Sequence, residues 1–429
     1  MDYRDLIAGV DVQIPLKDGR FVKAINFDNA ATTPPFISVV ESVVEFSKWY
    51  SSIHRGVGYK SKFCSEFYED ARERVLKFVG AGRKNTVIFV KNSTEALNKL
   101  SYRLIKDKDW VVLSTFMEHH SNDLPWRDKC IVDYIDIDEE GKLLKEDLIK
   151  KLEKHKGKVK FVTVTGASNV TGYVNDIDYI AEIVHKNGAK LIVDGAQLAG
   201  HKGINMKSDE DIHHIDYLVF SAHKMYAPFG IGAIVGPKES FEHGDPEYKG
   251  GGTVDLVTKD SVTWDEPPYK EEAGTPNIMG VSALVAAMEQ LSYIGMNNIE
   301  SYENIISEYT LERLKKLPYV TIYGHYDNNT KKVGIITFNI NNMYHQSVAK
   351  LLSENYGIAL RDGCFCAQPY MQRLLGMSTN TEDINQYLKS YEKPGAIRIS
   401  FGLYNNILEV DYFINSLNNI YQNYKRGLS

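Results

Sequence analysis

The feature that most constrains the fold is a regular alternation of short apolar runs with segments of helical periodicity. The runs are rich in β-branched and aromatic residues and stand at 86–90, 110–114, 160–166, 189–195 and 217–223. Between them lie amphipathic segments, of which the clearest are 93–105, 145–156 and 177–188. Short apolar runs separated by amphipathic helices predict a largely parallel sheet covered by helices. The sequence therefore predicts an α/β fold, with an antiparallel strand added at 230–236.

The C-terminal part of the chain has a different organisation. A stretch rich in glycine and bearing proline, from Lys249 to Gly280, leads into a long helical region. Beyond that region, strand-like and helix-like segments recur at 333–340, 345–357, 396–402 and 409–422. Such a change of pattern marks a candidate domain boundary. We expect an N-terminal segment that packs on the small domain, a large domain and a small C-terminal domain, at 1–24, 25–290 and 291–429 respectively.

Composition narrows the functional classes. The chain has 429 residues and a formal net charge of -6, and its charges are interspersed. The absence of a basic stripe argues against nucleic-acid binding. Without a secretory leader or an apolar stretch of about 18 residues, we expect no membrane association and a cytoplasmic location. The four cysteines do not form a disulfide framework, and Cys64 and Cys130 are expected to be structural.

A lysine and an aspartate leave the predicted sheet at comparable places. Asp194 ends one apolar run, and Lys224 follows another in a loop rich in glycine and proline. Ligands of parallel sheets bind at the carboxyl ends of the strands, where both side chains are expected. A lysine with a lowered pKa can attack an aldehyde cofactor, and a carboxylate can keep a pyridine nitrogen protonated. The alternative is a solvated surface lysine and an aspartate that caps a helix or forms a turn.

Other polar residues fit an anion such as a phosphate. Ser93 and Thr94 open the helix predicted at 93–105, so that hydroxyls and free backbone amides converge there. Ser221 and His223, beside the lysine, can donate to the same anion. The alternative is an ordinary helix N-cap with no ligand.

Two adjacent histidines follow the apolar run at 110–114. One of them, His119 or His120, can lie flat on an aromatic ring. Paired histidines are otherwise polar loop residues or metal ligands. No HxxxH or CxxC motif accompanies this pair, and we expect no metal site.

The motifs that carry these residues resemble, in kind and in order, those of a known family. They are FDNAATTP, NSTEALN, MEHHSNDLPW, ASNVTG, VDGAQ, SAHKMYAPFGIG, EAGTPN, RDGCFCAQP and IRISFGLYN. Their order is similar to that of the class V aminotransferase-like enzymes, and within them to the cysteine desulfurase and selenocysteine lyase group, over roughly residues 25 to 410. The resemblance implies a pyridoxal 5′-phosphate enzyme of fold type I. Its large domain would contain a mostly parallel seven-stranded sheet, and its C-terminal part would form a smaller α+β domain. The protein would be a homodimer with active sites at the interface.

The resemblance also implies roles for individual residues. Lys224 would bind the cofactor aldehyde covalently, Asp194 would face the pyridine nitrogen, and His119 would stack on the ring and shuttle a proton. Further contacts to the cofactor are implied for Asn169, Gln197, Ser93, Thr94, Ser221, His223 and, in the neighbouring subunit, Thr275. Arg398 would bind the substrate α-carboxylate, and the other implied substrate contacts are Asn169, Arg361 and His54.

Cys366 matches the family's nucleophile, which accepts sulfur from the substrate. The resemblance therefore implies a cysteine desulfurase that converts L-cysteine to L-alanine and passes sulfur, through a persulfide, to an acceptor such as a partner protein. Cys364 has no counterpart in the common pattern. On an extended segment its side chain would lie on the same side as Cys366 and could resolve the persulfide, the alternative being inert packing.

Other functions stay open at this point. The same lysine, aspartate and arginine would serve a C–S lyase that acts by β-elimination, a selenocysteine lyase, an aminotransferase or an epimerase. A non-catalytic scaffold or sulfur-relay protein with this fold is a further alternative. Intact Lys224 and Asp194 argue against that last class.

Overall fold

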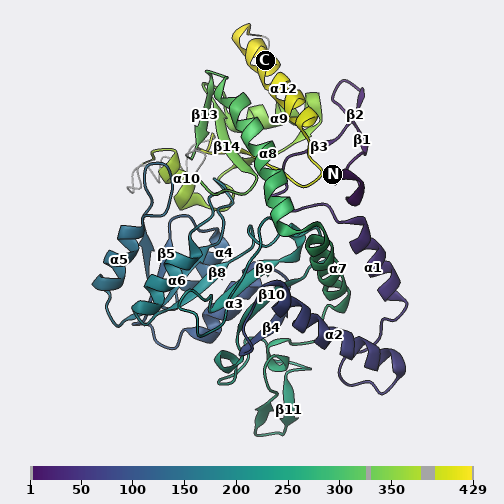
Figure 1. Cartoon of the computed structure of the whole chain (residues 1–429), viewed down its shortest axis with the longest axis vertical. Helices are drawn as coiled ribbons and strands as arrows, with labels where there is room; N and C mark the ends of the chain where they lie inside the picture. Colours follow the sequence, from purple (N-terminus) through teal and green to yellow (C-terminus); the bar gives the residue numbers. More distant parts are fainter. Residues whose placement is uncertain (1–2, 325–329, 378–391, 428–429) are drawn as a thin grey trace.

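The computed structural model describes residues 3–324, 330–377 and 392–427 (Figure 1). A seven-stranded sheet forms the centre of the larger, lower body in that view, and a four-stranded sheet lies in the upper body. The predicted α/β class is confirmed. Across the described residues, no single helix is long and apolar enough to cross a membrane. Only the consecutive helices α7 (Ile278–Ile294) and α8 (Met296–Lys315), bent by 75° at the break between them, pass that test as a pair.

The large sheet has one antiparallel strand among otherwise parallel ones. Its spatial order is β4 (Asn85–Val90), β10 (Gly232–Pro237), β9 (Tyr217–Ser221), β8 (Lys190–Asp194), β7 (Val159–Thr165), β5 (Val111–Thr115) and β6 (Ile131–Ile135). Strand β10 runs antiparallel to both neighbours, as predicted, and the other pairs are parallel. The sequence patterns predicted every one of these strands except β6.

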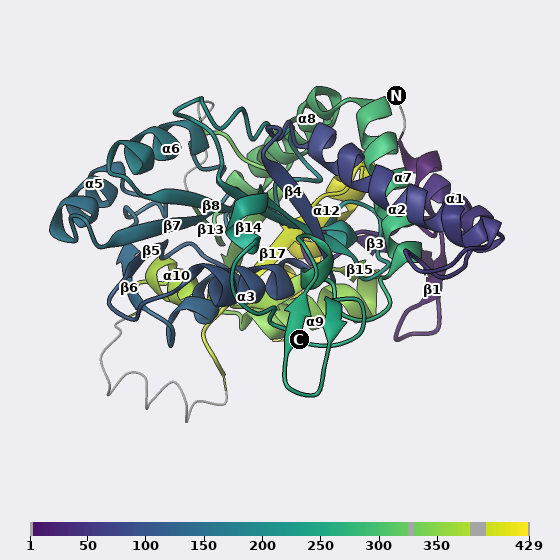
Figure 2. The ribbon, with the colours of Figure 1, turned by 90° about the horizontal axis from the view of Figure 1, so that it is seen from below.

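Helices cover both faces of the large sheet (Figure 2). Alternate side chains of each strand face opposite layers: Leu191 and Val193 belong to one buried cluster and Ile192 to another. The first cluster includes residues of α2 (Tyr59–Phe78), α5 (Lys145–Lys154), α6 (Ile177–Lys186) and α7 (Ile278–Ile294), with α1 (Ile37–Ser47) against α7. The second includes residues of α3 (Ser93–Leu104), close to the short α4 (His120–Asp123).

The small sheet is antiparallel and has its own core. Its order is β13 (Val320–Tyr323), β14 (Ile335–Ile340), β17 (Ala396–Ser400) and β16 (Arg361–Gly363). Buried side chains of the sheet pack with α8 (Met296–Lys315), α9 (His345–Tyr356) and α12 (Ile407–Lys425). A short helix, α10 (Gln368–Leu374), follows β16.

The N-terminal segment contacts the small sheet's helices. It forms a hairpin of β1 (Gln13–Pro15) and β2 (Phe21–Lys23), and β3 (Ile25–Asn26) then pairs in parallel with β15 (Ile358–Ala359). A second hairpin, β11 (Val254–Val257) and β12 (Val262–Trp264), projects from the other end of the molecule (Figure 1). The domain boundaries at residues 24 and 290 stay predictions.

Five short 3₁₀ segments complete the described secondary structure. They are η1 (Arg4–Leu6), η2 (Leu124–Trp126), η3 (Ala222–Lys224), η4 (Lys238–Phe241) and η5 (Tyr269–Glu271). Segment η3 matters most for function, because it carries Lys224 directly after β9.

Candidate active site

The loops that follow five strands of the large sheet enclose one cavity with parts of the small domain. Strands β4, β5, β7, β8 and β9 point the same way, so their carboxyl ends share one edge of the sheet. The cavity has a volume of about 280 Å³. Twelve of the predicted site residues line it: Ser93, Thr94, His119, Asn169, Asp194, Gln197, Ser221, His223, Lys224, Arg361, Cys366 and Arg398.

Lys224 has the electrostatic environment of a reactive amine. Segment η3 places it at the end of β9, and the side chain lines the cavity beside Asp194. Burial lowers the pKa of Lys224 to about 8, although the negative charge of Asp194 opposes the shift. A lysine of this kind is partly neutral near pH 7, which is the state that attacks a carbonyl.

Asp194 is a buried carboxylate at the last position of β8. Its side chain accepts a hydrogen bond from the backbone N–H of Ala196, at 3.0 Å. Burial raises the pKa of Asp194, while that hydrogen bond and the Lys224 charge act in the opposite direction. Among the described residues, Asp194 forms no ion pair within 4.0 Å, so its carboxylate can accept a proton or face a protonated ring nitrogen.

The start of α3 and the end of β9 form a cup of hydroxyls and amides. The Ser93 N–H donates to Ser221 Oγ at 2.8 Å, and the two hydroxyls also lie 2.8 Å apart. Thr94 Oγ1 lies 2.7 Å from Ser121 Oγ. The N-terminus of α3 adds its positive dipole, so this end of the cavity suits an anion.

His119 lines the cavity next to this cup, because its Nδ1 lies 2.9 Å from Ser121 Oγ, which also contacts Thr94. Its Nδ1 accepts a hydrogen bond from the Ser121 N–H at 3.1 Å. Because Nδ1 is an acceptor there, the neutral ring carries its proton on Nε2. Burial, with the positive charge of Lys224, lowers the pKa of His119 to about 4, and His223 is shifted in the same way. Both rings are therefore neutral near pH 7.

Arg398 comes from the small sheet and reaches the same cavity. Its guanidinium donates to the Asn169 carbonyl at 2.9 Å and to Asp28 Oδ1 at 3.0 Å, and it lies 5.0 Å from the Phe365 ring centroid. Arg361 binds the other Asp28 oxygen at 2.8 Å. Burial lowers the pKa of Arg398 to about 10, with Asp28 opposing the shift. The group stays cationic at pH 7 and can bind a carboxylate.

Cys366 lines the cavity, whereas Cys364 is not among the described residues that do. The expectation of an extended segment is wrong. Phe365 and Cys366 have φ values of +53° and +54°, and the Ala367 N–H donates to the Cys364 carbonyl at 2.9 Å, which makes a turn. The turn directs Cys364 Sγ to the Pro394 carbonyl, at 3.3 Å. All four cysteines are unbridged, and Cys64 is buried.

Two predicted site residues lie elsewhere in the chain. His54 and Thr275 line a separate cavity of about 720 Å³ between the start of α2 and the loop before α7. His54 Nε2 lies 3.0 Å from Glu69 Oε1. A single chain therefore does not bring these two residues to the site of Lys224.

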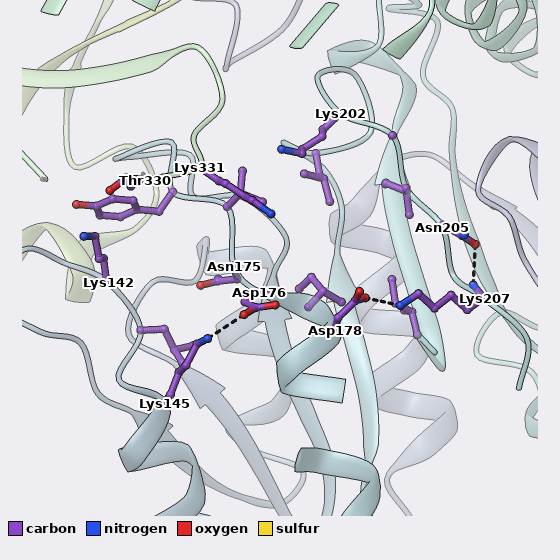
Figure 3. A pocket seen from close by; sticks show the side chains of 18 residues that line it. Lys142, Lys145, Asn175, Asp176, Asp178, Lys202, Asn205, Lys207, Thr330 and Lys331 are labelled. Carbon is purple, nitrogen blue, oxygen red and sulfur yellow. Dashed lines mark hydrogen bonds and ion pairs between the residues drawn. The ribbon is translucent and has the colours of Figure 1, made fainter. Parts of the chain in front are cut away.

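A further cavity, of about 630 Å³, contains charged groups but none of the predicted site residues (Figure 3). Five lysines and two aspartates line it. Lys145 pairs with Asp176 at 2.8 Å, and Lys207 pairs with Asp178 at 2.7 Å, as the dashed lines in Figure 3 show. Exposed pairs of this kind contribute little energy. None of the described side chains that line this cavity has a buried polar atom without a hydrogen-bond partner, whereas Gln197 and Arg398 at the Lys224 site do.

The sequence patterns missed two residues that support the site, Asp28 and Glu118, and considered a third, His120, only as a ring that could stack on an aromatic group. Asp28 joins Arg398 and Arg361, and buried Glu118 accepts hydrogen bonds from Thr115 Oγ1, Asn122 Nδ2 and the Thr165 N–H. Burial raises the pKa of Glu118 to about 8. His120 contacts the turn that carries Cys366. Both Asp28 and Glu118 stand inside recognised motifs, FDNAATTP and MEHH, which was the available signal.

Comparison with known proteins shows to which family the chain belongs. Residues 25–413 match the family described as Aminotransferase class-V. A probable cysteine desulfurase of Halalkalibacterium halodurans is 36% identical over 388 residues, covering 86% of this chain and 92% of that protein. A cysteine desulfurase of Haloferax volcanii is 33% identical over 421 residues, covering 95% and 92%.

Solved structures agree with the sequence comparison. The apo cysteine desulfurase of Thermococcus onnurineus NA1 superposes with a TM-score of 0.82 at 32% identity, covering 92% of this chain and 94% of that one. The Escherichia coli cysteine desulfurase CsdA superposes with a TM-score of 0.79 at 27% identity, covering 98% of both chains. The chain belongs to the Aminotransferase class-V family, and within it to the cysteine desulfurases.

Proposed function

We propose that this chain uses pyridoxal 5′-phosphate to convert L-cysteine to L-alanine and transfers the sulfur to Cys366 as a persulfide. The observation that carries the proposal is the presence of Cys366 in one cavity with Lys224, Asp194 and Arg398. A buried amine, a buried carboxylate, a guanidinium and a thiol are the groups that this reaction requires. Membership of the cysteine desulfurases supports the same activity.

The residues present fit the cofactor. Buried Gln197 Oε1 and Arg398 Nε have no hydrogen-bond partner among the described residues, so polar groups of the cavity await a ligand. Lys224 would hold the cofactor aldehyde, Asp194 the pyridine nitrogen and Gln197 the phenolic oxygen. The phosphate would lie in the cup of Ser93, Thr94, Ser221 and His223, and the ring against His119. When bound, the cofactor supplies an electron sink that makes the substrate α-proton acidic.

The chain's own residues would then bind the substrate and move its protons. Arg398 would bind the α-carboxylate and so orient the sulfur toward Cys366. Lys224, with its lowered pKa, would take the α-proton as general base. The Cys366 thiolate would attack the substrate sulfur, so that an S–S bond forms as the C–S bond breaks. The net change converts L-cysteine and the Cys366 thiol to L-alanine and a Cys366 persulfide, and it needs no external oxidant.

The homodimer expected from the resemblance would complete the site. His54 and Thr275 line a cavity apart from Lys224, as residues donated to a neighbouring subunit would. Large apolar side chains are exposed nearby, Val57 at 90% and Tyr59 at 76%. Exposed apolar patches of this kind fit a protein interface. A sulfur-acceptor protein and a cytoplasmic location belong to the same proposal.

Product analysis tests the proposed function. The holoenzyme is incubated with L-cysteine, with and without a reductant, and alanine, pyruvate and sulfide are quantified. We expect alanine, together with a one-sulfur adduct on the peptide that contains Cys366, and loss of both in Cys366→Ala. Steady pyruvate formation by the wild-type protein and by Cys366→Ala would contradict the desulfurase proposal and support a C–S lyase instead.

A further inference from the structure

The turn that carries Cys366 lies between β16 and α10 and has an unusual backbone. Both central residues, Phe365 and Cys366, are in the left-handed region, which side chains other than glycine rarely adopt. Residues hold such a conformation when the surrounding structure over-determines it, and functional sites are a common place to find this. The turn contains no glycine, so its shape depends on contacts from outside it.

His120 supplies two of these contacts. Its backbone N–H donates to the Cys366 carbonyl at 2.7 Å. Its ring Nε2 accepts a hydrogen bond from the Gln368 N–H at 3.1 Å. The two bonds lie on either side of Ala367, so His120 holds the backbone in place immediately after the Cys366 side chain.

The His120 ring also takes the place of the side-chain N-cap that α10 lacks. Gln368 is the first residue of α10, and the N-cap position, Ala367, has no side chain that can accept a hydrogen bond. Helices leave their first N–H groups unpaired, and Pro369, the next residue, has no N–H. The His120 ring is therefore the acceptor that the start of α10 needs.

A third contact secures the other side of the thiol. Asn169 Nδ2 donates to the Phe365 carbonyl at 2.7 Å. The carbonyls of Phe365 and Cys366 are thus both bound by residues that follow strands of the large sheet, Asn169 after β7 and His120 at the start of α4 after β5. His120 directly follows His119, so the loop that faces the ring site also fixes the nucleophile.

We propose that His120 is a positioning residue for sulfur transfer: its ring, as the external cap of α10, holds the left-handed turn that presents the Cys366 thiol to the cavity. The role rests on the proposed function. An amide N–H can only donate, so Nε2 must be unprotonated and the neutral ring must carry its proton on Nδ1.

Two variants of the holoenzyme separate positioning from general stability. His120→Leu removes the acceptor but keeps the backbone bond to Cys366, and His120→Gln offers a side-chain oxygen of similar reach. His213→Leu is the matched control, because His213 lies outside the cavity and pairs only with Asp211 and Glu182 among the described residues.

Hydrogen exchange reports the cap directly. We expect the amides of peptide 364–371 to exchange at least about tenfold faster in His120→Leu, and near the wild-type rate in His120→Gln and His213→Leu. Alanine formation should show a kcat about tenfold to a hundredfold lower in His120→Leu with KM within about threefold, and His120→Gln should recover most of that loss. The absorbance of the bound cofactor should be the same in all four proteins.

The opposite results would overturn the role. Unchanged exchange in His120→Leu would show that the ring does not cap α10, whatever the enzyme's product is. Faster exchange with wild-type kcat would show that the cap has no part in sulfur transfer. Equal losses in His120→Leu and His120→Gln, with weakened cofactor absorbance, would mean that His120 only supports folding. A wild-type enzyme that makes pyruvate would refute the proposed function. The hydrogen-exchange result would still show whether the His120 ring caps α10.

Discussion

Replacing Arg398 with alanine tests the proposal that this residue binds the substrate α-carboxylate. The guanidinium is 3% exposed and holds the Asn169 carbonyl and Asp28, while its Nε has no partner among the described residues. The variant removes this donor set from the cavity. It does not leave Asp28 alone, because Arg361 keeps its bond to the other carboxylate oxygen at 2.8 Å. We therefore expect a folded protein that binds its cofactor.

The size of the effect follows from the kind of bond that is lost. A hydrogen bond between charged groups contributes roughly 1.5–3 kcal/mol, which corresponds to a loss in kcat/KM of about tenfold to more than a hundredfold. The carboxylate is bound in the ground state as well as in the transition state, so most of the loss should appear as a higher KM. Arg398→Lys should recover only part of the activity, since an ammonium lacks the planar pair of donors.

Arg361→Ala is the comparison variant for Arg398→Ala, because Arg361 also lines the cavity and is a predicted substrate contact. Both arginines bind Asp28, but the Arg361 side chain is 50% exposed and Arg398 is buried. An exposed ion pair contributes about 0.2–1 kcal/mol, so Arg361→Ala should lose no more than about fivefold in kcat/KM where Arg361 only holds Asp28, and more where it contacts the substrate. The assay is steady-state alanine formation over a range of L-cysteine concentrations. If Arg398→Ala loses no more than Arg361→Ala, the assignment of the α-carboxylate to Arg398 is wrong.

Two further predictions concern Lys224 and Cys364. Because burial lowers the pKa of Lys224 to about 8, roughly a tenth of the amine is neutral at pH 7, against about 0.04% for an ordinary lysine. The rate at which cofactor-free protein binds pyridoxal phosphate, followed by absorbance, should rise with pH and level off above about pH 8; a rise that continues to pH 10 would contradict the shift. Cys364→Ala should keep both alanine formation and sulfur release near wild-type rates, since the turn directs its sulfur to Pro394, and slower release would restore the hypothesis of a resolving thiol.

The sequence predicted the central strands because burial on both faces demands continuous apolar runs. The sequence patterns did not predict strand β6, because it lacks such a run. It lies at the edge of the sheet, and its middle residue, Asp133, binds Lys151 at 2.7 Å and Lys154 at 2.8 Å. An edge strand with an ion-paired acid in its centre has no continuous apolar run. The pattern that identifies buried strands cannot identify such a strand.

The convergence of the site was predictable, but the local geometry of its nucleophile was not. Parallel strands place their carboxyl ends together, and this rule alone brought Lys224 to Asp194. The turn at Phe365 and Cys366 has left-handed residues without glycine, so no local signal marked it. Its shape comes from hydrogen bonds to residues about two hundred or more positions away in the sequence, which a local pattern does not encode.

The residues proposed to carry out the reaction come from segments next to both the large and the small sheet, and hydrogen bonds of Asn169 join the two groups. Asp194 ends β8 of the large sheet and Lys224 follows β9, whereas Arg398 lies in β17 of the small sheet and Cys366 follows β16. Asn169 joins them twice, because its carbonyl accepts from Arg398 and its side chain donates to the backbone next to Cys366. A change at Asn169 should therefore disturb carboxylate binding and thiol placement together. Asn169 would thus have two roles: it links the segments that carry Arg398 and Cys366, and it is expected to contact the bound ligands as well.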